Sequence, residues 1–309
     1  MVDFIKFKKQ NNEGEDIPKK RRFGFSFKRM LLWFLAFFII SSIISSISMS
    51  IAPKIAVVPI SGAIMTSSSS SLLSSGGANS REISESLYEI AEDSSIKGVI
   101  LDINSPGGSP VASEEISMAI EYVKEQGIPV YAVIGDAGAS GAFWIAMSAD
   151  KVYASSMSMI GSVGVTSAGL GIENLIKDYN ITYRRQTAGE FKDMGSPFRA
   201  PTEVENMKIQ KMLDEVHEAF ITHIAKARNL SYSQVKEDST GEIFLGTHGL
   251  QRGYIDEIGN YRTVLNDMKE LVGESSLVIN YGPKPSLFDG IGIESIYDKM
   301  GTKSSILLQ

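Results

Sequence analysis

The sequence predicts an α/β domain with a mostly parallel sheet, preceded by a single N-terminal transmembrane helix. Two observations predict this fold class. Apolar strand-like runs alternate with amphipathic helical patterns at the spacing of crossover connections, and an uncharged segment at residues 30–53 comes before them. The chain has 309 residues, of which 43% are hydrophobic, so it can bury a sizeable core.

The N-terminal segment differs in charge from the rest of the chain. Residues 1–30 hold nine Lys/Arg and four Asp/Glu, although the whole chain has a net charge of −6. The uncharged run that follows is long enough for a bilayer-spanning helix. Its basic N-terminal flank predicts a cytosolic N-terminus and an extracytoplasmic body at the cell membrane. The apolar region of a cleaved signal peptide would be shorter, and a buried core helix would be amphipathic.

These patterns divide the chain into four parts. We predict a cytosolic basic tail at 1–29, a transmembrane anchor at 30–52, a folded domain at 53–273 and a C-terminal tail at 274–309. The acidic body argues against a nucleic-acid partner, because such a surface would be basic.

Within the folded domain, the apolar runs place the strands in order. They are expected at 55–62, 98–104, 128–134, 151–154 and 242–245. Pro59 in the first run indicates an edge strand or a bulge, and the Ser/Gly-rich residues 66–80 form a loop. A long helix is expected at 203–228, opened by a capping box of Thr202 and Glu205.

A glycine turn follows the second predicted strand. It reads Ser105-Pro-Gly-Gly108 and comes just before a helix that Ser109 caps, with Pro110 at its first position. Successive glycines let the backbone approach a substrate closely, so the turn can supply the N–H groups of an oxyanion hole. The same residues can equally form an ordinary strand-to-helix turn.

Ser140 stands at the next strand-to-helix junction, between Ala139 and Gly141. This position resembles a nucleophile elbow, although Ala142 replaces the last glycine of the usual pattern. A serine hydroxyl needs a base to take its proton. Lys192 can be that base if burial holds its amine uncharged. The alternatives are a helix-capping serine and a surface lysine.

The other bases are less favoured. The histidines are His217, His223 and His248. His217 and His223 are six residues apart on the long helix and so face different ways, and His223 falls on an apolar stripe. The chain has no cysteine, which excludes thiol catalysis and disulfides. We expect no cofactor and no metal.

Five motifs in order resemble a known family. They are Asn104-Ser-Pro-Gly-Gly108, Ala139-Ser140-Gly141, Gly161-Ser-Val-Gly164, the run from Gly189 to Arg199, and Phe244-x-Gly246 followed by Gly253 to Gly259. Between about residues 55 and 261 the chain resembles the signal peptide peptidase A family, membrane-anchored serine peptidases of the ClpP/crotonase superfamily. The resemblance implies repeated ββα units around a mostly parallel sheet.

The resemblance also implies roles for single residues. Ser140 would be the nucleophile, Lys192 the general base and Ser162 the residue that orients the lysine amine. The backbone N–H groups of Gly107, Gly108 and Gly141 would form the oxyanion hole. The implied partners are peptide substrates, namely remnant signal peptides, the lipid bilayer, and copies of the chain in a ring or dome.

The sequence departs from the family pattern at two places and leaves two other functions open. Ala142-Phe143 stands where the family often has Gly-Tyr, and Tyr254 replaces a usual leucine. A crotonase-like acyl-CoA enzyme would share the fold and the glycine turn, but the anchor places the body away from cytosolic acyl-CoA. An inactive membrane scaffold would not need both Ser140 and Lys192.

Overall fold

The computed structural model describes residues 34–39, 52–66 and 77–282, and the chain divides into two compact units, 1–51 and 52–309. The predicted tail at 1–29 and most of the predicted anchor at 30–52 lie outside the described residues, as do residues 283–309. Residues 34–39 are helical. Among the stretches that the structure describes, no helix combines the length and apolarity that a bilayer crossing requires.

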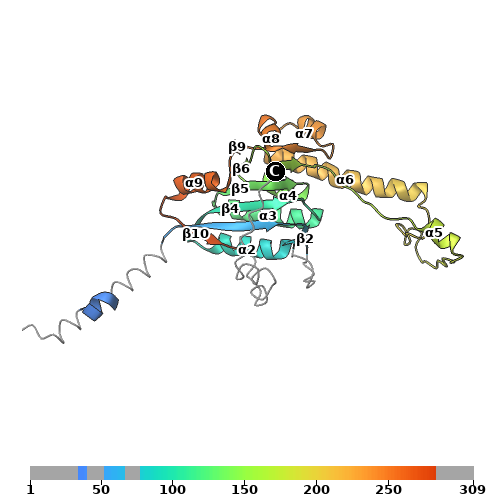
Figure 1. Ribbon diagram of the computed structural model, residues 1–309, viewed down its shortest axis with the longest axis horizontal. Coiled ribbons are helices and arrows are strands. Elements are labelled where there is room, and N and C mark those ends of the chain that lie inside the picture. The colour runs from blue at the N-terminus through green and yellow to red at the C-terminus, as the bar shows by residue number, and fades with distance from the viewer. Residues whose placement is uncertain (1–33, 40–51, 67–76, 283–309) are drawn as a thin grey trace, which may run out of the picture. The chain divides into compact units, whose positions relative to one another are not determined.

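The second unit is built on a mostly parallel sheet, which confirms the predicted α/β class (Figure 1). All neighbours along its main path pair in parallel. The strand order is β10 (Leu277–Asn280), β1 (Lys54–Ser61), β4 (Ile96–Ser105), β5 (Val130–Ala139), β6 (Lys151–Ala154) and β9 (Glu257–Ile258).

Strand β5 changes partner along its length. Its first half pairs with β6, and its last three residues pair with β7 (Met159–Gly161). Strand β7 in turn pairs antiparallel with β8 (Ile243–Leu245). A second small sheet joins β2 (Ile64–Met65) to β3 (Ala78–Asn79), and Ile64 also bridges to Gly108. The carboxyl end of β5 therefore lies between the glycine turn after β4 and the β7–β8 pair.

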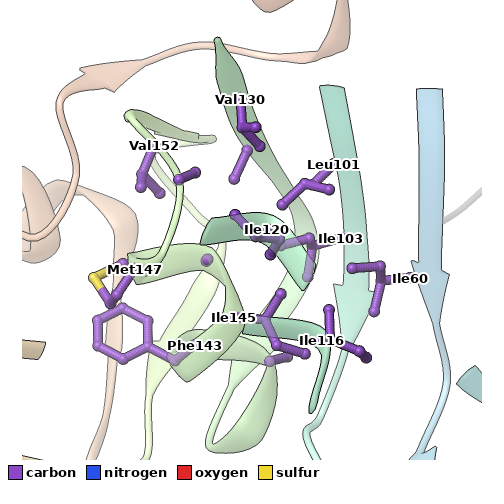
Figure 2. Close-up of a cluster of buried hydrophobic side chains, with 14 of the residues drawn as sticks. Ile60, Leu101, Ile103, Ile116, Ile120, Val130, Phe143, Ile145, Met147 and Val152 are labelled. Carbon is purple, nitrogen blue, oxygen red and sulfur yellow. The ribbon is translucent and has the colours of Figure 1, made fainter. Parts of the chain in front are cut away.

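Helices cover both faces of the main sheet. One face packs against α2 (Ser80–Glu92), α3 (Pro110–Glu125) and α4 (Gly141–Met147), and α9 (Tyr261–Val272) covers the other. Figure 2 shows Ile60, Leu101 and Ile103 of the sheet beside Ile116, Ile120 and Ile145 of the helices. Each of these side chains is fully buried or nearly so. This rigid core holds the ends of β4 and β5 in place.

The helix starts follow the predicted capping residues. Ser109 accepts a hydrogen bond from the N–H of Ala112, and Pro110 is the first residue of α3. Thr202 and Glu205 form the predicted capping box at the start of α6 (Glu203–Ala227). Shorter helices complete the unit: α5 (Glu173–Asp178), α7 (Tyr232–Asp238) and α8 (Gly246–Gln251).

Helix α6 is anchored to the rest of the unit mainly by its C-terminal half. Phe220, Ile221 and Ile224 are buried there, whereas Glu205 is the one buried residue among the first turns. With 25 residues, α6 is roughly 37 Å long. Residues 166–202, here called the arm, are largely exposed and include α5, which Figure 1 places beyond the N-terminal end of α6.

Two features of the sheet were not evident from the sequence. Strand β10 pairs with Lys54–Val57 of β1, so the first residues of β1 have a strand on each side, β10 and β4. Pro59 lies beyond the last of these pairs and faces no β10 neighbour, which explains how a residue without an N–H group fits there. The strand also extends the fold beyond Gly273, where the sequence pattern fades.

Candidate active site

Ser140 lies at the junction of β5 and α4 in a strained conformation. Its φ is 52° and its ψ is −125°, values that a non-glycine residue adopts rarely. Its N–H donates a 2.8 Å hydrogen bond to the carbonyl of Gly161, and its own carbonyl accepts from Trp144 N–H at 3.0 Å. Such strain persists where the surrounding structure over-determines it, commonly at functional sites. The geometry is that of a nucleophile elbow.

Ser162 is brought next to this elbow by the β7–β8 pair. It also has a positive φ, of 54°, and its N–H donates to the carbonyl of Glu242 at 2.7 Å. Gly161 has a φ of 87°, and a Cβ atom there would lie 2.8 Å from Cδ1 of Phe244. The late motif that begins at Phe244 thus packs against the turn that carries Ser162.

The glycine turn after β4 packs against the same elbow. A Cβ atom on Gly107, whose φ is 97°, would lie 2.7 Å from the nitrogen of Gly141 and 2.8 Å from Cβ of Ser140. The buried N–H of Gly107 already donates to Oγ of Ser105 at 3.1 Å. Gly108 is exposed and lines a cavity together with Ser140 and Gly141. Of the three predicted glycines, Gly108 and Gly141 therefore face the open space beside Ser140.

Two cavities open at Ser140, and helix α6 lines both. The smaller, of about 180 Å³, has apolar walls from Pro110, Trp144, Val165, Val216 and Phe220. The larger, of about 410 Å³, is polar. It is lined by Ser140, Ser162, residues 163–166, Gln210, Leu213, Asp214, His217 and residues 239–241. A peptide carbonyl held at Ser140 would thus have an apolar space on one side and a polar space on the other.

Within one chain, Lys192 lies apart from Ser140, Ser162 and the glycines beside them. It is exposed on the arm, in a turn closed by the hydrogen bond from its own N–H to the carbonyl of Gly189. Within the part of the chain that the structure describes, it lines neither cavity at Ser140. The structure therefore brings together Ser140, Ser162 and the predicted glycines, and it leaves the predicted base on the arm.

The histidines differ from the expectation in one case. His217 lines the polar cavity that holds Ser140, a placement that its position in the sequence did not predict. His217 is three, four and seven residues before the buried Phe220, Ile221 and Ile224, so it lies on the same side of α6 as they do. This spacing is the sequence signal for its position toward the site. No hydrogen-bond partner for its Nε2 atom is found among the described residues.

His223 has the packing role that its position in the sequence predicted. Its ring stacks on Trp144 with centroids 4.3 Å apart, and Nε2 lies 3.1 Å from the Trp144 carbonyl oxygen. Burial lowers the pKa of this imidazole. The histidine thereby fixes Trp144, whose ring forms part of the apolar cavity.

Comparison with known proteins agrees with these features. The family that matches is described as peptidase family S49, over residues 123–275. A putative signal peptide peptidase SppA of Enterococcus faecium is 33% identical over 70% of this chain and 63% of its own length. A putative protease of Methanocaldococcus jannaschii is also 33% identical, over 63% of each chain.

The chain is also similar to a further protease and to a solved structure. A putative protease of a Synechocystis species is 30% identical over 67% of this chain and 70% of its own length. Among solved structures, a mutant of the 1510-N membrane-bound stomatin-specific protease is 16% identical, with a TM-score of 0.47 over 75% of this chain and 99% of that chain. The chain spans 63% of the length of the first two relatives named. Together, the serine elbow, the family match and the sequence relatives show that the chain belongs to peptidase family S49, the serine peptidases that include signal peptide peptidase A.

Proposed function

We propose that this chain is a membrane-anchored serine endopeptidase with a Ser140–Lys192 dyad, which degrades remnant signal peptides and other short membrane-associated peptides. The observation that carries the proposal is the strained Ser140 elbow, which opens on an apolar and a polar cavity beside the amides of Gly108 and Gly141. Its fold is of the ClpP/crotonase type. In support, β1 is followed by β2 and β3 of the small second sheet and then by α2, and β4 is followed by Gly108, which bridges to Ile64 of β2, and then by α3.

The base would come from a neighbouring copy of the chain. The polar cavity contains both Ser140 and Ser162 and has room for a lysine side chain, but Lys192 of the same chain lies on the exposed arm. In a ring or dome, each copy would present its arm to the next through a heterologous interface. Ser162 would then accept a hydrogen bond from the incoming amine and orient it toward Ser140.

The reaction would follow the usual course of acyl transfer. The uncharged Lys192 amine removes the Ser140 proton as Oγ attacks the peptide carbonyl, and the N–H groups of Gly108 and Gly141 stabilise the oxyanion. The ammonium then gives its proton to the leaving amine. Water, deprotonated by the same amine, hydrolyses the acyl-enzyme. Gly107 would join the oxyanion hole if its N–H were released from Ser105.

The substrate class follows from the apolar cavity and the predicted anchor. A cavity walled by Trp144, Val216 and Phe220 fits an apolar side chain next to the scissile bond. The uncharged run at 30–53 and its basic flank support an anchor that holds the catalytic domain on the extracytoplasmic side of the cell membrane. A remnant signal peptide is apolar and is released at that surface.

The proposal is tested by serine labelling and peptide cleavage. Wild-type protein should react with a fluorophosphonate and cleave an apolar peptide, whereas Ser140→Ala and Lys192→Ala should do neither while remaining folded. Normal reaction of the Lys192 variant would contradict the proposed dyad. Binding of coenzyme A without peptide cleavage would favour a crotonase-like enzyme, and folded wild-type protein without labelling would favour a scaffold.

A further inference from the structure

The residue next to the proposed base has its carboxylate fully engaged by other groups. The Asp193 side chain is 10% exposed. Its Oδ1 accepts a 2.7 Å hydrogen bond from the Tyr183 hydroxyl, and its Oδ2 lies 2.7 Å from Nε of Arg199 and 3.3 Å from Nε of Arg185. The hydrogen bonds from Tyr183 and Arg199 hold the pKa of Asp193 below its ordinary value. This carboxylate is therefore charged and enclosed.

Arg199 is in turn fixed to the start of α6. Its Nη2 and Nη1 atoms donate to the two carboxylate oxygens of Glu205 at 2.6 and 2.8 Å, and Nη2 also donates to the Asp193 carbonyl at 2.8 Å. Glu205 belongs to the capping box with Thr202. The paired, two-pronged geometry is the kind that gives a guanidinium both strength and direction. Arg199 thus ties the lysine-bearing turn to a helix end.

The Lys192 amine stays outside this network. In the described part of the chain, its Nζ atom takes part in no hydrogen bond or ion pair. The arm also carries the charged residues Arg185 and Glu190, and the start of α6 carries Glu205 and Lys208. Lys208 lies over the Phe191 ring, 4.5 Å from its centroid. Asp193 directly follows Lys192 in the sequence, and the guanidinium groups of Arg185 and Arg199 both contact its carboxylate.

We propose that Arg199 is a positioning residue for the catalytic lysine, because it occupies the Asp193 carboxylate and so prevents an ion pair between Asp193 and Lys192. This inference rests on the proposed function of Lys192. A base must be uncharged to accept a proton, and a free carboxylate within about 4–6 Å would favour the ammonium form. Arg199 therefore keeps the amine available for Ser140 and also holds the turn in one place.

The inference predicts a defined change in pH dependence. In Arg199→Met, the Asp193 carboxylate loses its 2.7 Å guanidinium partner and keeps Tyr183 and the longer contact to Arg185. More of its charge then acts on Lys192, so the rising limb of kcat/KM against pH should move to higher pH. A shift of one pH unit corresponds to about a tenfold loss of activity on the low-pH side, with recovery at high pH. Arg199→Lys keeps a cation on Asp193 and should leave the limb close to that of wild type.

The deciding variant is the double substitution of Arg199→Met and Asp193→Asn. If the freed carboxylate causes the shift, the double variant should return the limb to its wild-type position, although Arg199 is still missing. A purely structural role would instead give an equal loss at every pH that Asp193→Asn does not repair. That outcome, or an Arg199→Met profile with an unmoved limb, would overturn the inference.

Two measurements keep the test decisive. Should Arg199→Met fail to fold, Asp193→Asn alone is informative, because it should leave the limb unmoved or move it to lower pH, and an upward shift would contradict the inference. Lys192→Ala is labelled in parallel with the fluorophosphonate. Full labelling of that variant would reject the proposed dyad itself, whereas an inert Lys192→Ala with an unmoved Arg199→Met limb would reject only the role of Arg199.

Discussion

The backbone N–H of Ser140 donates a 2.8 Å hydrogen bond to the carbonyl oxygen of Gly161, which directly precedes Ser162. Ser140 and the residue before Ser162 are therefore joined by a main-chain contact at the end of the β5–β7 pair. Both serines have a positive φ. The contact explains why Ser140, the proposed nucleophile, and Ser162, the proposed orienting hydroxyl, can share one cavity although they belong to different loops.

Gly161→Ala should disrupt this contact. The added Cβ would collide with the Phe244 ring, 2.8 Å from its Cδ1 atom, and would lie 3.0 Å from the Glu242 carbonyl oxygen, at a φ of 87°. Gly127→Ala is the matched control, because Gly127 has a φ of 76° but nothing within 4 Å of an added Cβ. Strain alone costs about 1–3 kcal/mol. Thermal denaturation should show a larger loss for Gly161→Ala, and serine labelling should fall only in that variant. Equal behaviour of the two would contradict the role of the contact.

Histidine and lysine can be distinguished as bases by substitution. We expect His217→Ala to retain fluorophosphonate reactivity within about threefold, whereas Lys192→Ala should lose about a hundredfold or more, the range of general-base catalysis. The measurement is the second-order rate of labelling at fixed pH. If His217→Ala were inert and Lys192→Ala reactive, the imidazole in the polar cavity would be the base.

The apolar cavity should set the size of the preferred side chain. Val216→Ala enlarges the cavity that Trp144 also lines. The kcat/KM ratio of a bulky over a small apolar residue next to the cleaved bond should therefore rise on the order of tenfold. Val204→Ala removes the same atoms from an exposed site on α6 and serves as the control. An unchanged ratio in Val216→Ala would show that this cavity does not receive the side chain.

The Arg199–Glu205 pair should make the arm sensitive to acid. Hydrogen bonds from Arg199 lower the pKa of Glu205 to about 2, from an ordinary value of 4.5. Because the folded-state pKa is depressed, the stabilisation is present above pH 4.5 and is lost as the pH falls toward about 2. Amide hydrogen exchange of the arm between pH 5 and 2.5 should show the loss, after correction for the intrinsic rate. Glu205→Gln should be less protected at pH 5 and change less on acidification.

The sequence predicted the fold class and the capping residues because these depend on local patterns. The apolar runs gave the parallel strands, Ser109 and Thr202 opened their helices, and the small residues around Ser140 indicated an elbow. Strand β10 was missed because Leu277–Asn280 is short and its pairing with β1 is a long-range contact.

The site was harder to predict where it depends on how elements dock. His217 faces the cavity because Phe220, Ile221 and Ile224 set the rotation of α6, which no local pattern decides. The engagement of the Gly107 N–H by Ser105 depends on the local turn geometry. The separation of Ser140 from Lys192 depends on the direction in which α6 and the arm extend from the sheet. The spacing of the residues in the sequence does not specify that direction.

Mixing two inactive variants tests the Ser140–Lys192 pairing between copies most directly. Ser140→Ala keeps the lysine and Lys192→Ala keeps the serine, so joint assembly should regenerate complete sites. Random mixing in equal amounts should restore about a quarter of wild-type cleavage, because each site draws its two residues from different chains. If the variants assemble together, as shown by co-purification of two differently tagged chains, and cleavage stays absent, the lysine of one copy does not serve the serine of another.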